Sequence, residues 1–232
     1  MRIWDIDPGY LNRQSLLGEH RELHGIVSII ANNKKGYSSH PETLRWVGYG
    51  WALRQRHKLL AAEMDLRGYI DRSPVLLRSK PEAWPERYID APATQLSILS
   101  EKYKTLEPGR IPLPKNAQQL WAQHKYSVMA RDIPSYKRFG KWVTSRQGSK
   151  DSHQVALELN AILRQPPNPK LIENVLLHMW GYVSGYADFS GKEIQDMPHD
   201  KLLSHIRRLA LDNNVTYLTE STVLGELGAW KY

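Results

Sequence analysis

The first residue of the chain carries the group with the most distinctive chemistry, a primary α-amine. Because Arg2 is large, the initiator methionine should not be removed, and we expect the amine of Met1 to be the mature terminus. Its reference pKa of about 7.7 to 8.0 leaves roughly 10 to 20% of it neutral at pH 7, far more than for a lysine. Such an amine can attack C1′ of a deoxyribose, expel the base and form an imine, which permits β-elimination of the 3′ phosphate.

This chemistry needs a carboxylate that stabilises positive charge on the sugar and moves protons, and Glu22 is the best candidate. Apolar residues over 11–30 recur at helical spacing, and on that helix Gln14, Gly18 and Glu22 share one face. Glycine in a helix costs about 1 kcal/mol relative to alanine, so Gly18 and Gly25 should leave room for a nucleotide backbone or for the N-terminal strand. The alternatives are a solvated Glu-Arg pair and glycines that simply allow helix packing.

The segment Met1–Val27 resembles, without a gap, the start of the endonuclease V-like family of pyrimidine-dimer DNA glycosylases. The residues that carry the resemblance are Arg2-Ile3, Leu11, Gln14, Leu16 and Glu19-His20-Arg21-Glu22-Leu23. Similarity to bacterial members extends through Lys34–Pro41 and the helix ending at Tyr69, so it covers about residues 1–110. The resemblance implies that the Met1 amine is the nucleophile and that Glu22 is the essential glutamate.

The same resemblance implies a DNA-binding surface on this half of the chain. The residues expected to contact DNA are Arg2, Gln14, His20, Arg21, Lys34 and Lys35. The chain departs from the family where Gly25 replaces an arginine and His20 replaces a tyrosine. These departures affect the grip on the DNA backbone and with it the choice of lesion.

His20 and His24 flank Glu22 in the sequence HRELH, which invites comparison with the zinc-protease motif HExxH. In that motif the glutamate directly follows the first histidine, whereas Glu22 comes two residues after His20 and is rotated about 200° from it. We therefore predict no metal site, and the imine chemistry requires no organic cofactor.

A proline-rich segment, 107–116, predicts a linker between a catalytic domain over 1–106 and a helical accessory domain over 117–232. Before it we predict helices over 11–30, capped by Asn12, and over 41–69, followed by a loop over 73–92. After it the predicted helices cover 117–130, 135–145, 153–163, 169–186, 199–212 and 219–229. Because the one strand candidate, 215–218, is weak, the fold class is all-α.

The second half resembles an uncharacterised helical domain of bacteria, over roughly residues 117–232. The resemblance rests on His124-Lys125-Tyr126, Met129-Ala130, Tyr136, Gly140, Asn174-Val175, His178 and Gly181-Tyr182. It implies a helical fold and no known chemistry.

A basic stretch, 131–150, lies early in this second half. Lys137, Arg138 and Lys141 could hold DNA while Phe139 and Trp142 stack on bases. Equally, the two aromatic residues could be buried in the core, with the basic residues on the solvent-exposed face of the helix. A second aromatic group, Trp180, Tyr182 and Tyr186, favours helix packing over a platform for bases.

Composition limits the function classes. The net charge of +8 favours a polyanionic partner, and the absence of cysteine excludes disulfides and thiolate metal sites. The chain start lacks the pattern of a secretory signal, and no long apolar run follows, so we expect a cytoplasmic protein that joins the nucleoid when bound to DNA. The expected partner is double-stranded DNA with damaged pyrimidines, not a membrane. The sequence thus predicts a repair glycosylase with abasic-site lyase activity; the alternatives are a non-catalytic DNA-binding protein and an enzyme for another lesion or for abasic sites.

Overall fold

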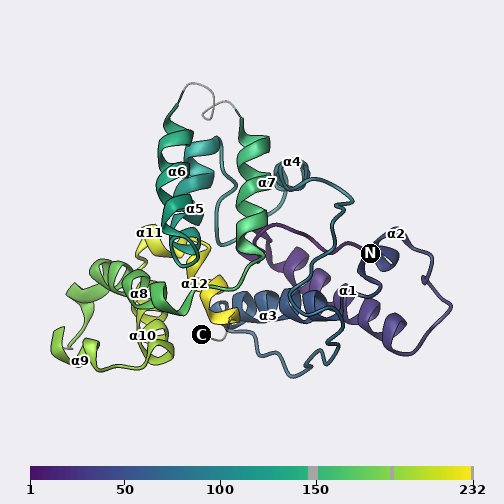
Figure 1. Cartoon of the computed structure of the whole chain (residues 1–232), viewed down its shortest axis with the longest axis horizontal. Coiled ribbons are helices and arrows are strands. Elements are labelled where there is room, and N and C mark those ends of the chain that lie inside the picture. Colours follow the sequence, from purple (N-terminus) through teal and green to yellow (C-terminus); the bar gives the residue numbers. More distant parts are fainter. Residues whose placement is uncertain (146–150, 189–190, 231–232) are drawn as a thin grey trace.

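The computed structural model describes residues 1–145, 151–188 and 191–230, and in these ranges the only regular structure is helical (Figure 1). The predicted all-α class is confirmed. The strand candidate over 215–218 is wrong, because the short helix α11 (Thr216–Thr219) occupies that position. No described helix combines the length and the apolar character that crossing a bilayer would require.

The first half is built on two long helices, α1 (Arg13–Ala31) and α3 (Gly50–Leu66). The predicted cap of α1 is confirmed, since the Asn12 side chain accepts a hydrogen bond of 2.9 Å from the backbone N–H of Ser15. The single helix predicted over 41–69 is wrong. The chain forms α2 (Pro41–Trp46) and then turns at Gly48, whose φ of +85° lies in the left-handed region, before α3 begins.

A non-helical segment after α3 leads to α4 (Pro92–Lys102), a helix that the sequence patterns did not predict. The segment packs against the start of α3, where the N–H of Trp51 donates to the carbonyl oxygen of Ser79 at 3.0 Å. Gly50 allows this approach, because a Cβ there would lie 2.7 Å from that of Leu77. These contacts explain why the chain turns before α3 although its helical spacing continues through the turn.

The second half contains two helical groups, each with its own core. The first group is α5 (Ala117–Met129), α6 (Ile133–Thr144) and α7 (Ser152–Leu163), which pack around the buried Phe139. The second is α8 (Pro169–Val183), α9 (Gly191–Gln195), α10 (His199–Asp212), α11 and α12 (Val223–Glu226), with short 3-10 helices over Ser184–Tyr186 and Leu227–Ala229. The helix predicted over 219–229 is therefore shorter and split.

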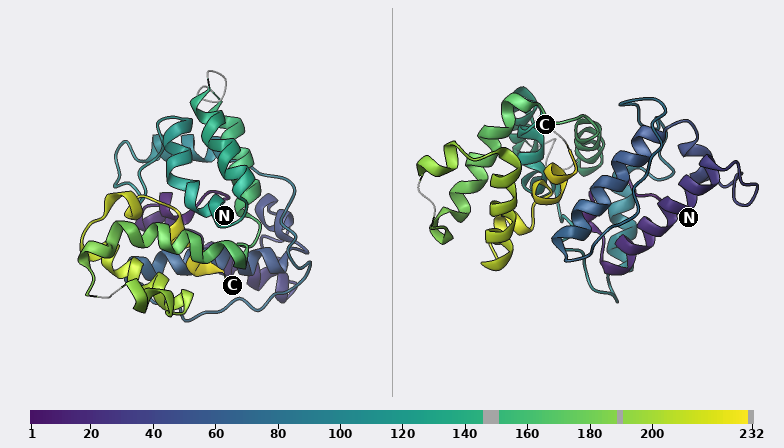
Figure 2. Two further views of the ribbon diagram at one scale, coloured as in Figure 1. Left: turned by 60° about the vertical axis from the view of Figure 1, so that its left-hand side comes forward. Right: turned by 90° about the horizontal axis from the view of Figure 1, so that it is seen from below.

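The two halves pack directly against each other, as the purple-to-blue and green-to-yellow parts of Figure 2 show. α12 and the 3-10 helix after it lie on α3, and α7 lies on α4. Trp230 contacts Trp51 with ring centroids 6.3 Å apart. The segment 107–116 contains no helix, and its Ile111 is buried, with its N–H bound to the carbonyl oxygen of Gly9 at 2.9 Å.

Candidate active site

Two carboxylates of α1 bind the N-terminal segment. Glu22 Oε2 accepts a hydrogen bond from the backbone N–H of Arg2, and Glu19 Oε1 accepts one of 3.1 Å from the N–H of Trp4. The carboxylates are three residues apart, about one helical turn, and the N–H groups they bind are two residues apart. This pairing fixes the segment along α1 and brings Met1, the residue before Arg2, next to Glu22.

Glu19 is buried and has a second partner, Arg56, which no sequence motif indicated. Arg56 of α3 binds it with two hydrogen bonds, of 2.7 and 2.8 Å, and also donates to the carbonyl oxygen of Ile6 at 2.7 Å. Burial raises the pKa of Glu19, whereas the guanidinium of Arg56 opposes that rise. The carboxylate therefore belongs to a buried ion pair that locks residues 4–6 to α1 and α3.

Glu22 faces a more open surface. Cβ atoms built on Gly18 and Gly25 would meet no described atom within 4 Å, so the N-terminal segment does not occupy the room that these glycines leave. Of the two occupants that we predicted, the N-terminal strand is therefore wrong. We call this surface of α1 the open edge; it consists of Gln14, Gly18, Arg21, Glu22 and Gly25.

Two predicted DNA contacts lie on the open edge, and Gln14 and Arg21 are both exposed there. Together with Leu17 and Glu107 they line a shallow groove. The Nε of Arg21 donates to the carbonyl oxygen of Leu17 at 3.2 Å, which holds the guanidinium along the helix.

Arg2, Lys34 and Lys35, the other basic residues of this half that we predicted to contact DNA, differ in whether an acidic side chain already binds them. Arg2 is paired with Asp90 at 2.8 Å, and its guanidinium lies 4.8 Å from the centre of the Trp4 ring. Lys34 and Lys35 are exposed in the turn that follows α1, and Lys34 Nζ donates to a serine hydroxyl. A phosphate can reach the two lysines directly, whereas at Arg2 it must compete with Asp90.

His20 does not lie on the open edge. Its Nε2 is 3.2 Å from Asp71 Oδ1, and its side chain is only 14% exposed. His24 and His57 complete a cluster of groups that could hold a metal ion. His20 thus offers little surface to DNA, and the prediction that it binds DNA gains no support from the geometry.

The basic residues of α6 lie far from the chain start. Lys137, Arg138 and Lys141 are exposed, and Arg138 is paired with Glu158 at 2.8 Å. Figure 1 shows α6 well away from the N terminus, with α7 and α4 between them. Phe139 is completely buried, so for this ring the core alternative is correct. Arg146 and Lys150, at the end of the basic stretch, lie outside the described residues.

The aromatic residues at the end of α8 have mixed environments. Trp180 packs against the core of the second half, as we predicted. Tyr182 stacks on Tyr217 with ring centroids 4.4 Å apart, and Tyr186 is 55% exposed. For Tyr186 the choice between helix packing and a platform for bases stays a prediction.

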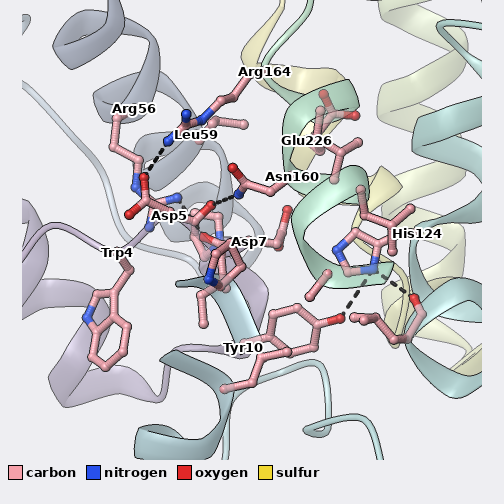
Figure 3. Close-up of a pocket in the computed structure, with 18 of the residues that line it drawn as sticks. Trp4, Asp5, Asp7, Tyr10, Arg56, Leu59, His124, Asn160, Arg164 and Glu226 are labelled. Atoms are coloured by element: carbon pink, nitrogen blue, oxygen red, sulfur yellow. Dashed lines mark hydrogen bonds and ion pairs between the residues drawn. The ribbon is translucent and has the colours of Figure 1, made fainter. Parts of the chain in front are cut away.

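A small cavity lies between the two halves (Figure 3). Its volume of about 50 Å³ accommodates a few waters and is far below the space that a nucleotide needs. Asp5 lies at one wall, where Arg164 binds its carboxylate at 2.6 Å and the side-chain amide of Asn160 donates to its carbonyl oxygen. At another wall, Tyr10 donates to Gln123 at 2.8 Å. The residues that line this cavity connect the two halves, and the cavity is not a candidate DNA site.

Four carboxylates in and around this cavity form a group that we call the acid seam: Asp5, Asp7, Glu63 and Glu226. Burial and the nearby Glu63 raise the pKa of Asp7 to about 7, although its carboxylate accepts a hydrogen bond from Gly9. Burial also favours neutral Glu63, but Arg110 and Arg67 more than offset this and hold its pKa below the usual value.

Arginines neutralise three of the four acids in the seam. Asp5 is paired with Arg45 and Arg164, Glu63 with Arg67 and Arg110, and Glu226 with Arg131. His124 adds no charge there, because burial lowers its pKa to about 4. Of these pairs, Asp5–Arg164 links the two halves directly, and Arg110 extends the Glu63 pair to the carbonyl oxygens of Thr219 and Ser221.

Comparison with known proteins assigns the two halves separately. No curated protein and no solved structure matches the chain. Residues 125–226 match a family described as a protein of unknown function, in line with the resemblance of the second half. Residues 1–76, which carry Met1, Glu22 and the open edge, match the family model of pyrimidine dimer DNA glycosylase.

Proposed function

We propose that the protein is a DNA glycosylase with abasic-site lyase activity that acts on damaged pyrimidines in double-stranded DNA. The α-amine of Met1 is the nucleophile, and Glu22 is the carboxylate that assists it. The observation that carries the proposal is the hydrogen bond from the Arg2 N–H to Glu22, which keeps the first residue beside this carboxylate. The family match over residues 1–76 supports damaged pyrimidines as the substrate class.

The chemistry begins with the neutral amine. Its nitrogen forms a bond to C1′, the bond between C1′ and the base breaks, and the base leaves with the electron pair and takes up a proton. The nitrogen then loses a proton, the bond between C1′ and the ring oxygen O4′ breaks, and O4′ takes up a proton, which leaves an imine at C1′. Glu22 stabilises the positive charge on the sugar and receives protons. Loss of a proton from C2′ expels the 3′ phosphate and nicks the strand.

The open edge supports the approach of DNA to these two groups. Gly18 and Gly25 leave space on either side of Glu22, and the exposed Gln14 and Arg21 lie along the same helix. Arg2, Lys34 and Lys35 add positive charge around this surface. A target nucleotide must leave the base stack for C1′ to come within bonding distance of the amine. We expect α6 to contribute little, because it is remote from the chain start.

Borohydride trapping tests the proposal. The full chain, with Met1 as its first residue, is incubated with a duplex that contains one pyrimidine dimer, and the reductant converts the imine into a stable covalent adduct. Glu22→Gln should lower base release and nicking by at least about 100-fold, because general acid–base groups contribute about 10²–10⁴ in rate. Glu101→Gln is the matched control, since Glu101 is exposed on α4 and should leave the rates unchanged.

A second form of the protein separates the terminal amine from an internal lysine. An uncleaved N-terminal extension should abolish the adduct while circular dichroism shows an intact fold. Full adduct formation by the extended chain, or wild-type rates for Glu22→Gln, would contradict the mechanism. DNA binding by the natural chain without any adduct would instead identify a non-catalytic DNA-binding protein.

The lesion is tested with the same assay on duplexes that carry an oxidised pyrimidine or an abasic site. Preference for the dimer supports the proposal as stated. An adduct on abasic DNA alone would retain the imine chemistry but overturn the glycosylase step.

A further inference from the structure

A cluster of three histidines and one aspartate lies on another flank of α1. His20 and His24 meet His57 of α3 and Asp71 of the segment that follows α3. One nitrogen or oxygen atom from each residue lies within 4.8 Å of the corresponding atoms of the other three. His20 and His24 are four residues apart and project from one face of the helix. The sequence HRELH gives no sign of this cluster, because His57 and Asp71 are distant from it along the chain.

The separations suit a small ion. In a tetrahedral zinc site with bonds of about 2.0 to 2.1 Å, neighbouring ligand atoms lie about 3.3 to 3.4 Å apart. His20 Nε2 is 3.2 Å from Asp71 Oδ1, and His57 Nε2 is 3.3 Å from Asp71 Oδ2. The ring centroid of His24 is 4.7 Å from that of His20 and 4.9 Å from that of His57. Small rotations of the side chains would close the four groups around one ion.

His57 provides independent evidence for a ligand. Its side chain is only 5% exposed, and its Nε2, although 3.3 Å from Asp71 Oδ2, forms no hydrogen bond with any described residue. A neutral imidazole carries a lone pair on one of its ring nitrogens. A buried polar atom without a partner is unfavourable, and coordination to a metal would satisfy it.

Ser73 supports the cluster from outside. Its hydroxyl donates to Asp71 Oδ1 at 2.8 Å, its backbone N–H donates to the same atom at 3.1 Å, and the hydroxyl oxygen lies 3.2 Å from His24 Nε2. These hydrogen bonds orient the carboxylate, as outer partners of a metal ligand do.

We propose that His20, His24, His57 and Asp71 bind one Zn²⁺ ion. Three imidazoles and one carboxylate form a ligand set that zinc accepts, and four protein ligands leave no open position for a substrate. The site is therefore structural. It ties α1 to α3 and to the segment after α3, and it holds the helical turn that carries Glu22.

Metal content and stability test the site without any measurement of activity. The full chain is purified, analysed for metals by mass spectrometry, stripped with a chelator and titrated with Zn²⁺ by calorimetry and thermal unfolding. We expect one zinc per chain and a Tm that rises with zinc concentration, because an ion that binds only the folded state stabilises it. Co²⁺ in place of zinc should give the visible absorption of a tetrahedral site.

His24→Asn and Asp71→Asn should weaken zinc binding by at least about tenfold and remove the rise in Tm, while circular dichroism shows a helical chain. His153→Asn is the control, because His153 is an exposed histidine on α7, away from the cluster. A stripped wild-type chain whose Tm does not respond to zinc would overturn the proposal. So would equal zinc affinity in the variants and the wild type. If neither variant folds, X-ray absorption on the zinc-loaded wild type decides, since a shell without imidazole would contradict the site.

Discussion

The open edge and the acid seam both place carboxylates near the first residues of the chain, but these carboxylates differ in burial and in the groups that bind them. In the seam, the side chains of Asp5, Glu63 and Glu226 are buried and bound by arginines. On the open edge, Glu22 is half-buried and accepts a hydrogen bond from a backbone N–H. An arginine-bound carboxylate is neutralised and fixes the packing around it. Glu22, bound by a backbone N–H, remains partly exposed to solvent.

Glu19 lies one turn from Glu22 but belongs with the arginine-bound group, and its substitution should give the largest effect. Glu19→Gln leaves the guanidinium of the 2%-exposed Arg56 without its counter-charge. Breaking a buried pair in this way costs about 3–5 kcal/mol. We expect the free energy of unfolding, measured by urea denaturation, to fall by that amount.

The exposed pair between Glu101 and Lys104 is the control for this prediction. Glu101→Gln should change the free energy of unfolding by less than about 1 kcal/mol, because surface ion pairs contribute little. If Glu19→Gln and Glu101→Gln lowered the free energy of unfolding equally, burial of a carboxylate ion pair would make no difference to its contribution to stability.

The sequence predicts the open edge well because α1 is a local structure. Its apolar spacing, the Asn12 cap and the four-residue interval from Gln14 to Gly18 to Glu22 all follow from nearby residues. The resemblance added the pairing of Met1 with Glu22, which helical spacing alone does not supply. Local spacing does not predict the turn at Gly48, because the turn between α2 and α3 depends on the packing of residues 77–79.

The seam and the histidine cluster could not be predicted, because their members are distant in the sequence. Asp5 meets Arg164, Glu63 meets Arg110, and neither pair shares a motif. His57 and Asp71 likewise reach His20 only through the packing of α3 on α1. Arginines and histidines in the middle of helices give no signal of burial until the tertiary structure is known.

Asp7 sharpens the comparison, because no arginine among the described residues forms an ion pair with it and its pKa is raised to about 7. The unfolded chain releases this proton near pH 4, whereas the folded chain keeps it until about pH 7. The folded state therefore binds more protons in that window, and its stability falls as pH rises from about 4 to 7. Asp7→Asn should remove a slope of up to about 1.4 kcal/mol per pH unit, measured by denaturation at several pH values.

Asp132 is the matched control, because it also accepts a hydrogen bond from a backbone N–H but lies nearer to solvent. Hydrogen bonds from Ser135 lower the pKa of Asp132, so it contributes stability that is lost as pH falls through the low folded-state pKa. Asp132→Asn should therefore change the pH dependence in the opposite direction. Identical profiles for Asp7→Asn and the wild type would show that Asp7 ionises normally in the folded state.

The smallest effect should come from Gly18, where stability and DNA affinity are expected to change in opposite directions. A Cβ there meets no described atom, so Gly18→Ala should stabilise α1 by up to about 1 kcal/mol through helix propensity. If a nucleotide backbone lies on the open edge, the same methyl group weakens binding to lesion-containing DNA several-fold, measured by fluorescence anisotropy. Gly181 on α8 likewise has no described atom near its Cβ position. Gly181→Ala should therefore raise the free energy of unfolding without weakening the binding of DNA. Equal affinities for the two variants would mean that DNA does not approach Gly18, and the space beside Glu22 would then need another explanation.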